Sequence, residues 1–282
     1  MCGRYVVVSK LKAIEKRFQL REISRDLFSE EPQANVSIGQ YAPVISSEFP
    51  ETLQLMQFGL TPFWAKKPTY FFNARSEGDS NKENDPNYKG TKGIITKPAF
   101  RHTIRRKRCL VIADAFIEGS KKDRLNKPYL IYRRDGLKPF ALAGLWDSWT
   151  NKDTGEVISS FAIITTTANE ILQKIGHHRS PVLLSQDNEA MWLDEETPLG
   201  EVTTILRPYP SNELNAYPIS PAIKNPRAEG LDLLLPIGQR IYPEYDFEIH
   251  QELSIEGMGA TTARKRRDAE DHEKPKPPTL FD

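Results

Sequence analysis

The second residue, a cysteine, is the strongest candidate for a reactive group in this sequence. The chain opens Met1-Cys2-Gly3-Arg4-Tyr5, and removal of Met1 would leave Cys2 with an α-amine and a thiol on adjacent carbons. Such an aminothiol condenses with an aldehyde to an imine, after which the thiol adds to the same carbon and closes a thiazolidine ring. An α-amine (pKa roughly 7.7–8.0) and a thiol (roughly 8.5) are both usable near neutral pH. A cysteine at this position is more often incidental, so other residues must support the hypothesis.

Two arginines and an asparagine are candidates for holding a substrate. If Asn73-Ala74-Arg75 is extended, the side chains of Asn73 and Arg75 share one face and Ala74 points away. The guanidinium fork of an arginine grips phosphate oxygens bidentately. Arg4 lies only two residues from Cys2, where it could hold a phosphate beside the reacting centre. The alternative for either arginine is ordinary surface charge.

Glu118 is the candidate for proton transfer. It ends an apolar run from Leu110 to Ile117 that only Asp114 interrupts. A carboxylate at the end of a buried strand is partly desolvated, which raises its pKa toward the range that suits acid–base catalysis. A solvent-facing Glu118 is the alternative. Asp114, like Cys109 and Asp147, is interpreted as structural.

The adjacent histidines His177 and His178 are the second proton-transfer candidate. In an extended segment neighbouring side chains point to opposite sides, so we expect only one imidazole to face a given site. The unperturbed imidazole pKa of about 6.5 leaves both protonation states accessible. A metal site on this pair is disfavoured, because no Cys, Asp or Glu stands at ligand spacing.

Four aromatic side chains have two interpretations. Exposed rings stack on the bases of single-stranded nucleic acid, whereas core packing is the commoner fate of tryptophan. The four are Phe63, Trp64, Trp146 and Trp149, of which Trp146, within Ala143-Gly144-Leu145-Trp146, is expected in the core.

The chain resembles the SRAP family (SOS-response-associated peptidases) of abasic-site processing proteins. The resemblance spans most of residues 1 to about 240 and rests on five segments in the family's order. They are the opening Met1–Tyr5, Asn73-Ala74-Arg75-Ser76-Glu77, Arg108-Cys109-Leu110-Val111-Ile112-Ala113-Asp114 running on to Glu118, Ala143-Gly144-Leu145-Trp146, and His177-His178-Arg179-Ser180-Pro181. Short motifs have high false-positive rates singly, but five in order are specific.

The resemblance implies a role for each candidate. Asn73 would lie against Cys2, Arg75 would hold DNA phosphate, and the stretch ending in Phe63 and Trp64 would wedge into DNA. The family pattern His-x-Arg-Met-Pro selects His177 over His178, to act on the sugar oxygen during ring opening, while Glu118 handles imine formation. The chain departs from the family at three positions, which are Ile117, Gly119 and Ser180.

The implied activity is that of a sensor of abasic sites in single-stranded DNA. Cys2 would form a thiazolidine crosslink with the ring-opened sugar, protecting the site during the DNA damage response. Autoproteolytic removal of the residue before Cys2 and a weak lyase activity are expected as accompanying reactions. Two alternatives stay open, a thiol hydrolase with an N-terminal nucleophile and a non-covalent single-strand binder. No cofactor, metal or membrane partner is expected, and the protein is expected to be a monomer.

Short strands at close spacing predict the elements that position these residues. Strands are expected over 52–60, 109–117, 128–133, 139–146, 157–166, 181–184, 214–219 and 231–237, and helices over 10–20, 169–175 and 189–193. Many strands with few helices favour an α+β domain around a curved antiparallel sheet or barrel.

Composition bounds the remaining organisation. The formal net charge is +1, hydrophobic residues make up 38%, and the two cysteines provide no disulfide framework. No apolar stretch suits a membrane helix or a signal peptide, so we expect an intracellular protein, cytoplasmic or nucleoid-associated, or nuclear in a eukaryote.

Residues 1–245 are predicted as one domain, with 78–97 as a surface loop and 246–282 as a C-terminal extension, disordered from about 259. Two basic runs, Arg101–Arg108 and Arg264–Arg267, are either phosphate contacts or solvated charge.

Overall fold

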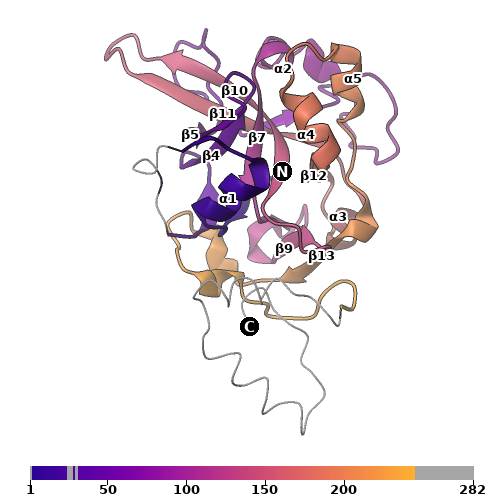
Figure 1. Ribbon diagram of the computed structural model, residues 1–282. Coiled ribbons are helices and arrows are strands. Elements are labelled where there is room, and N and C mark those ends of the chain that lie inside the picture. The colour runs from indigo at the N-terminus through magenta and orange to yellow at the C-terminus, as the bar shows by residue number, and fades with distance from the viewer. Residues whose placement is uncertain (1, 24–27, 29–30, 245–282) are drawn as a thin grey trace, which may run out of the picture.

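A closed barrel of five strands forms the centre of the computed structural model, which describes residues 2–23, 28 and 31–244 (Figure 1). Successive strands around the ring are antiparallel, and a parallel pairing between the last strand and the first closes it, with Ser160 and Phe161 opposite Gln57 and Phe58. In order around the ring the strands are β5 (Thr52–Phe58), β4 (Tyr41–Ser46), β7 (Arg108–Ala113), β10 (Phe140–Thr150) and β11 (Val157–Thr167). Figure 1 shows the β10–β11 hairpin projecting from the body.

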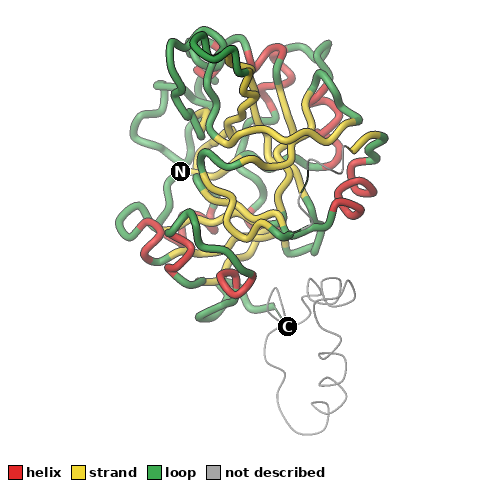
Figure 2. Tube along the Cα trace, turned by 90° about the vertical axis from the view of Figure 1, so that its left-hand side faces the viewer, coloured by secondary structure: helices red, strands yellow, loops and turns green. Residues whose placement is uncertain are grey.

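A second, antiparallel sheet packs beside the barrel and contains the strand that follows Cys2. Its strand order is β13 (Leu214–Pro218), β9 (Pro128–Arg133), β8 (Ala115–Gly119), β1 (Arg4–Val7) and β3 (Gln33–Ser37). Strand β1 is buried on both faces, because Tyr5 and Val7 enter the barrel core while Val6 and Val8 enter a second core. The crossing strands of the two sheets are visible in Figure 2. The start of β1 is therefore held between two packed layers.

Three short strands complete the sheets. Strand β6 (Asn73–Arg75) pairs in parallel with residues 163–165 of β11, and β12 (Arg179–Pro181) pairs antiparallel with residues 165–167. The two-residue β2 (Glu22–Ile23) joins the edge of β5. The end of β11 thus aligns two segments that are about a hundred positions apart in the sequence.

Five short helices of the described chain surround the sheets, with α3, α4 and α5 along one side (Figure 1). Asn169 caps α3 as predicted, since its side chain accepts the Leu172 N–H. The helices are α1 (Leu11–Phe18), α2 (Thr103–Arg106), α3 (Glu170–Ile175), α4 (Gln186–Leu193) and α5 (Leu199–Thr204), with 3₁₀ turns η2 (Gly93–Ile95), η3 (Arg124–Asn126), η4 (Ser211–Glu213), η5 (Pro221–Lys224) and η6 (Leu231–Leu234). The α+β class with a barrel-like core is confirmed.

Three of the predicted strands are wrong. The strand expected over 181–184 lies at Arg179–Pro181 as β12, so only Pro181 of the predicted range belongs to it. The expected strand over 109–117 is two strands, because the chain leaves the barrel at Asp114 and enters the second sheet as β8. Asp114 makes the break by accepting the Val8 and Ser9 N–H groups at 2.6 and 2.8 Å. The expected strand over 231–237 is the turn η6, whose Leu233 and Leu234 both pack into the second core.

The described chain ends at Glu244, which accepts a hydrogen bond from the Tyr132 hydroxyl at 2.7 Å and pairs with Arg134 at 2.8 Å. The predicted extension from 246, its disorder and the run Arg264–Arg267 lie outside the described residues. Within the described part of the chain, the helices are all too short or too polar to cross a bilayer.

Candidate functional site

Cys2 lies immediately before β1 with its side chain fully buried. The Asn73 side-chain amide donates to the Cys2 carbonyl oxygen at 3.2 Å, and the Cys2 thiol lies 3.8 Å from the Arg4 carbonyl oxygen. Burial raises the pKa of the Cys2 thiol well above its ordinary value, and the negative charge of Glu118 raises it further. At neutral pH the group is therefore a thiol, which needs a base before it can act as a nucleophile.

Glu118 reaches the same region from β8, the neighbour of β1 in the sheet, where Tyr5 pairs with Phe116 and Val6 with Ala115. Its side chain is 5% exposed. Burial raises the pKa of Glu118 to about 7, so the desolvation expected from the sequence is present. A carboxyl group with this pKa populates both protonation states near neutral pH, as an acid–base group requires.

His177 follows α3, whose left-handed cap at Gly176 turns the chain so that the His177 N–H donates to the Leu172 carbonyl. The His177 Nδ1 lies 2.6 Å from the Gly119 carbonyl oxygen. A carbonyl only accepts, so we assign the proton to Nδ1, which leaves the Nε2 lone pair 3.5 Å from Glu118 Oε2. Burial lowers the pKa of His177 to about 4. Of the two groups, Glu118 is the one with a transferable proton near pH 7.

The two histidines do not point to opposite sides, which corrects the expectation from the sequence. Their rings stack with centroids 5.0 Å apart and planes inclined by 30°. The reason is that both residues lie between the cap of α3 and the start of β12, outside any strand, so the alternation of an extended chain does not apply. Burial lowers the pKa of His178 to about 4 as well, so both imidazoles are neutral at pH 7.

Asn73 and Arg75 stand on β6 with Ala74 fully buried between them, which matches the expected alternation. The Arg75 guanidinium donates to the Asn81 carbonyl and, at 3.1 Å, to the Asn84 side chain. These contacts bring the predicted loop 78–97 up to the site. The half-buried Arg4 donates to the carbonyl oxygens of Gly3 and Lys224 at 3.0 and 3.4 Å. Both guanidinium groups therefore already bind protein acceptors.

Phe63 and Trp64 project from the segment between β5 and β6, with 59% and 51% of their surfaces exposed. The backbone beneath them is fixed, because Asp147 accepts the Phe63 N–H at 2.8 Å and Trp149 donates to the Ala65 carbonyl at 2.7 Å. The predicted core positions of Trp146 and the structural role of Asp147 are confirmed. The rings form a rigid, exposed aromatic platform of the kind that stacks on bases.

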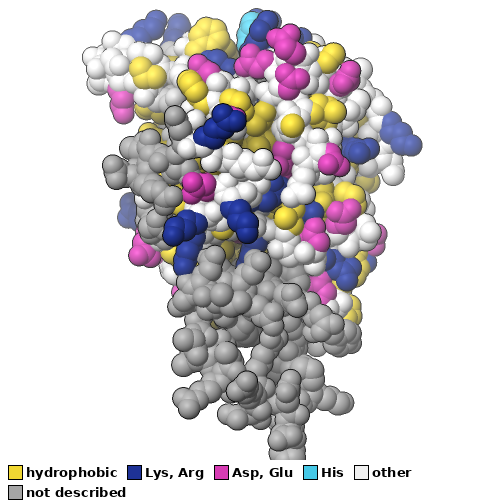
Figure 3. Space-filling model, viewed as in Figure 1, with side chains coloured by type: hydrophobic (Ala, Val, Ile, Leu, Met, Phe, Trp, Pro, Cys, Tyr) yellow, Lys and Arg dark blue, Asp and Glu magenta, His cyan; other side chains and the backbone are white. Residues whose placement is uncertain are grey.

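The basic run over 101–108 lies beside this platform and is divided by burial. His102 contacts Phe63 edge-to-face with ring centroids 6.5 Å apart, and Arg101, Arg105 and Arg106 are exposed. Arg108 is 1% exposed and donates to the carbonyls of Trp192 and Ile104. Arg108 is a core residue, so phosphate contact is excluded for that end of the run. Figure 3 shows basic and histidine side chains at the end of the molecule where α2 lies.

The departures from the family pattern have local packing explanations. Ile117 fills the second core. Gly119 admits no side chain, because a Cβ there would lie 1.8 Å from the Arg124 carbonyl oxygen. Ser180 is fully buried and donates to the Pro181 carbonyl at 3.1 Å. Glu118 lies between Ile117 and Gly119 on β8 with its side chain buried.

Sequence reasoning gave no role to Glu77 and Arg179, which form a buried ion pair at 2.8 Å beneath the site. Both belong to the motif segments that carry Asn73 and His177. The signal in the sequence was that each of these segments contains a charged residue, Glu77 or Arg179, to which no role was assigned. Among the described residues, no three His, Cys, Asp or Glu side chains gather as metal ligands would.

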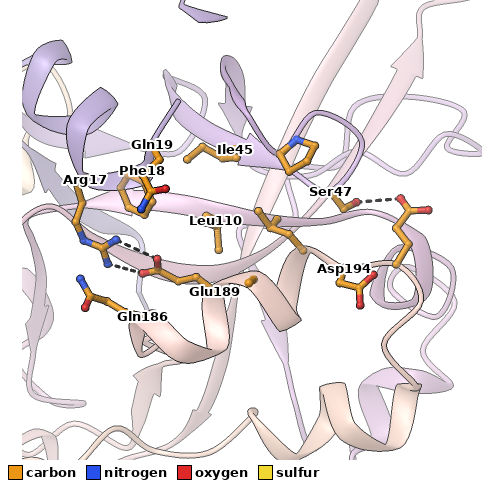
Figure 4. A pocket seen from close by; sticks show the side chains of 13 residues that line it. Arg17, Phe18, Gln19, Ile45, Ser47, Leu110, Gln186, Glu189 and Asp194 are labelled. Carbon is orange, nitrogen blue, oxygen red and sulfur yellow. Dashed lines mark hydrogen bonds and ion pairs between the residues drawn. The ribbon is translucent and has the colours of Figure 1, made fainter. Parts of the chain in front are cut away.

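A cavity of about 700 Å³ lies away from these residues, between α1, β4 and α4 (Figure 4). Ile45 and Leu110 line it, and the Arg17 guanidinium spans it to grip Glu189 through two hydrogen bonds of 2.7 and 3.1 Å. None of the predicted site residues lines this groove.

The family model for SOS response associated peptidase (SRAP) matches residues 1–226. The chain belongs to the SRAP family. Two curated SRAP relatives are the abasic site processing proteins YoqW of Bacillus subtilis, 30% identical over 83% of this chain and 99% of its own length, and YedK of Escherichia coli, 28% identical over 84% and 100%. A solved structure from Bacteroides thetaiotaomicron superposes with a TM-score of 0.70 and 27% identity, covering 82% of this SRAP chain and 98% of that one.

Proposed function

We propose that the chain captures abasic sites in single-stranded DNA through Cys2. The observation that carries this proposal is the fully buried Cys2 beside Glu118, with its backbone held by Asn73. An abasic deoxyribose opens to a C1′ aldehyde, the electrophile that an aminothiol traps. The names of the relatives, which the alignments cover over almost their full length, support the same substrate.

The reaction follows from the protonation states of the site. After removal of Met1, the Cys2 amine attacks C1′ and forms a carbinolamine. Protonated Glu118 gives its proton to the hydroxyl group, and water leaves as the iminium forms. The thiol then adds to the iminium carbon while the ionised Glu118 takes its proton. One aldehyde and one aminothiol yield one thiazolidine and one water, and Glu118 returns to its starting form.

The role of His177 in this scheme differs from the one that the family resemblance implies. Its Nδ1–H donates to the Gly119 carbonyl, so the Nε2 lone pair is the atom that it presents on the Glu118 side. A neutral imidazole there accepts a hydrogen bond from a protonated carboxyl or from the opening sugar hydroxyl. His177 therefore orients proton transfer, and Glu118 supplies the proton.

DNA would bind over the guanidinium groups and the aromatic platform. Arg4 and Arg75 exchange their carbonyl acceptors for the flanking phosphates, because a guanidinium group forms stronger hydrogen bonds with a charged acceptor than with a neutral one. Phe63 and Trp64 stack on the bases beside the abasic site. A crosslink closed to the thiazolidine leaves little iminium for β-elimination, so lyase activity is weak. We infer a monomeric, intracellular protein whose domain ends near residue 245.

The test is an intact mass after denaturation of protein mixed with a single-stranded oligonucleotide that carries one abasic site. We expect an adduct of protein plus oligonucleotide minus water. Cys2→Ala and protein that retains Met1 should give none. No adduct from protein shown to begin at Cys2 would overturn the proposal.

The same samples separate the two alternatives. A thiol hydrolase turns over peptide substrates without DNA and loses this turnover in Cys2→Ala. A non-covalent binder shows salt-dependent affinity that Cys2→Ala leaves unchanged, and it yields no adduct.

A further inference from the structure

The buried ion pair between Glu77 and Arg179 is the strongest feature near the site that the proposed chemistry does not use. One Arg179 nitrogen, Nη2, lies 2.8 Å from Glu77 Oε2, and both side chains are 1% exposed. The same nitrogen donates to the Thr165 carbonyl at 2.8 Å, and the Thr166 hydroxyl donates to Glu77 Oε1 at 3.3 Å. The pair is thus fixed to β11 at two neighbouring residues.

Its place in the topology joins the two segments that carry the site. Glu77 follows β6, which holds Asn73, and Arg179 begins β12, two residues after His177. Both strands pair with β11, and both pairings include Thr165. The ion pair adds a direct bond between the two segments at the point where β11 brings them together.

The pair is charged at neutral pH. Burial by itself raises the pKa of Glu77, but the hydrogen bond and charge of Arg179 outweigh it and hold that pKa below its ordinary value. The Arg179 charge also contributes to the lowered pKa of His177. Glu77 therefore compensates the charge of a buried cation that lies close enough to act on the imidazole.

We propose that Glu77 and Arg179 are positioning residues, whose ion pair sets the placement of Asn73 relative to His177 and so holds Cys2 in line with its acid–base group. The inference rests on the proposed capture reaction. It differs from simple stabilisation, because small displacements of reacting groups cost rate even when the fold persists.

Glu77→Gln tests this role, because the amide can keep a hydrogen bond while the charge is lost. The matched control is Glu189→Gln, which makes the same change in the buried Arg17–Glu189 pair of the groove in Figure 4. Both variants are compared with the wild type below their melting temperatures. At saturating abasic DNA, Glu77→Gln should lower the crosslinking rate constant about tenfold or more, with no rise in the half-saturating DNA concentration. Glu189→Gln should leave both values within about twofold of the wild type.

The double variant Glu77→Met/Arg179→Met separates positioning from stability. Replacing a buried ion pair by apolar residues often restores stability. A double variant as stable as the wild type that still crosslinks slowly supports the proposal, and recovery of the rate overturns it. A raised half-saturating concentration with an unchanged rate constant also overturns it, because Arg179 would then act as a DNA ligand.

Hydrogen–deuterium exchange without DNA provides a readout that does not depend on crosslinking. Glu77→Gln should speed exchange in peptides that cover 73–77 and 177–181, and Glu189→Gln should not. If wild-type protein formed no adduct, the proposed function would fail while this measurement still reported on the pair. Unchanged exchange in both segments would overturn the positioning role.

Discussion

Two buried carboxylates, Glu118 near Cys2 and Glu189 in the α1–α4 groove, show how two environments act differently on the same chemical group. Glu189 receives two charge-assisted hydrogen bonds from Arg17. Glu118 faces the neutral imidazole of His177, whose Nε2 lies 3.5 Å from Glu118 Oε2. Their side chains are 10% and 5% exposed, so burial alone does not distinguish them.

The difference lies in how strongly each environment raises the pKa of its carboxyl group. Burial raises the pKa of Glu189, but the hydrogen bonds and charge of Arg17 lower it, so the groove holds a structural ion pair. Burial raises the pKa of Glu118 to about 7. The ionised state of Glu118 is therefore less stable in the folded protein than in water. The same pKa lets the carboxyl group exchange protons near neutral pH.

The largest expected effect is on the rate of crosslinking to abasic DNA. Glu118→Gln should slow crosslinking by about 10²–10⁴-fold, because it removes the proton donor for carbinolamine dehydration. In the wild type the rate should fall as the pH rises through about 7, since the protonated fraction of Glu118 falls. Single-turnover rates from pH 5 to 9 check both points. A slow variant that kept the same alkaline limb would assign that limb to another group.

The two carboxylates should affect stability with opposite signs. The pKa of Glu118 is raised from its ordinary value of 4.5 to about 7, so its stabilising contribution is complete below pH 4.5 and is lost as the pH rises through 7. At pH 8 Glu118→Gln should therefore raise the free energy of unfolding by about 3 kcal/mol. Glu189→Gln should lower it by about 1–3 kcal/mol, because the half-buried Arg17 guanidinium loses its charged hydrogen-bond partner. Urea unfolding at pH 4 and pH 8 measures both, and a destabilised Glu118→Gln would contradict the comparison.

The aromatic platform should contribute to DNA binding where an equally exposed ring elsewhere does not. Trp64→Ala should weaken binding of single-stranded DNA by about 1–3 kcal/mol, because a stacked base is lost. Phe49, which is 49% exposed and lies on the turn beside the groove residue Ser47, provides the control. Fluorescence anisotropy at fixed salt compares Trp64→Ala with Phe49→Ala. Equal losses in the two variants would remove the platform from the binding surface.

The smallest effect expected is that of Asn73→Ala. The lost hydrogen bond to the Cys2 carbonyl is worth about 1 kcal/mol, so crosslinking should slow about fivefold. Asn215 provides the control, because its side-chain amide donates to the Tyr242 carbonyl at 2.9 Å from β13, which β9 and β8 separate from β1 in the second sheet. Single-turnover crosslinking should be unchanged in Asn215→Ala. A rate for Asn73→Ala equal to that of the wild type would remove Asn73 from the site.

Local patterns predicted most of the elements and the desolvation of Glu118. The α1 and α3 helices and the strands β5, β9, β11 and β13 follow from periodicity and capping that act over a few residues. The break at Asp114 was not predicted, because a continuous apolar run has the same pattern whether it lies in one sheet or crosses from one sheet to another. The stacking of His177 and His178 was missed because it depends on a bend that the adjacent cap of α3 produces.

By itself, the sequence determined the candidate reactive group, its candidate partners and the α+β class, since these depend on residue types and short-range spacing. The tertiary structure decided the protonation states, because the pKa values of Cys2, Glu118 and His177 depend on burial and on one another. It also decided that Arg108 is core and that Glu77 pairs with Arg179. Those contacts join residues that are distant in the chain, and only the meeting of β6 and β12 on β11 brings them together.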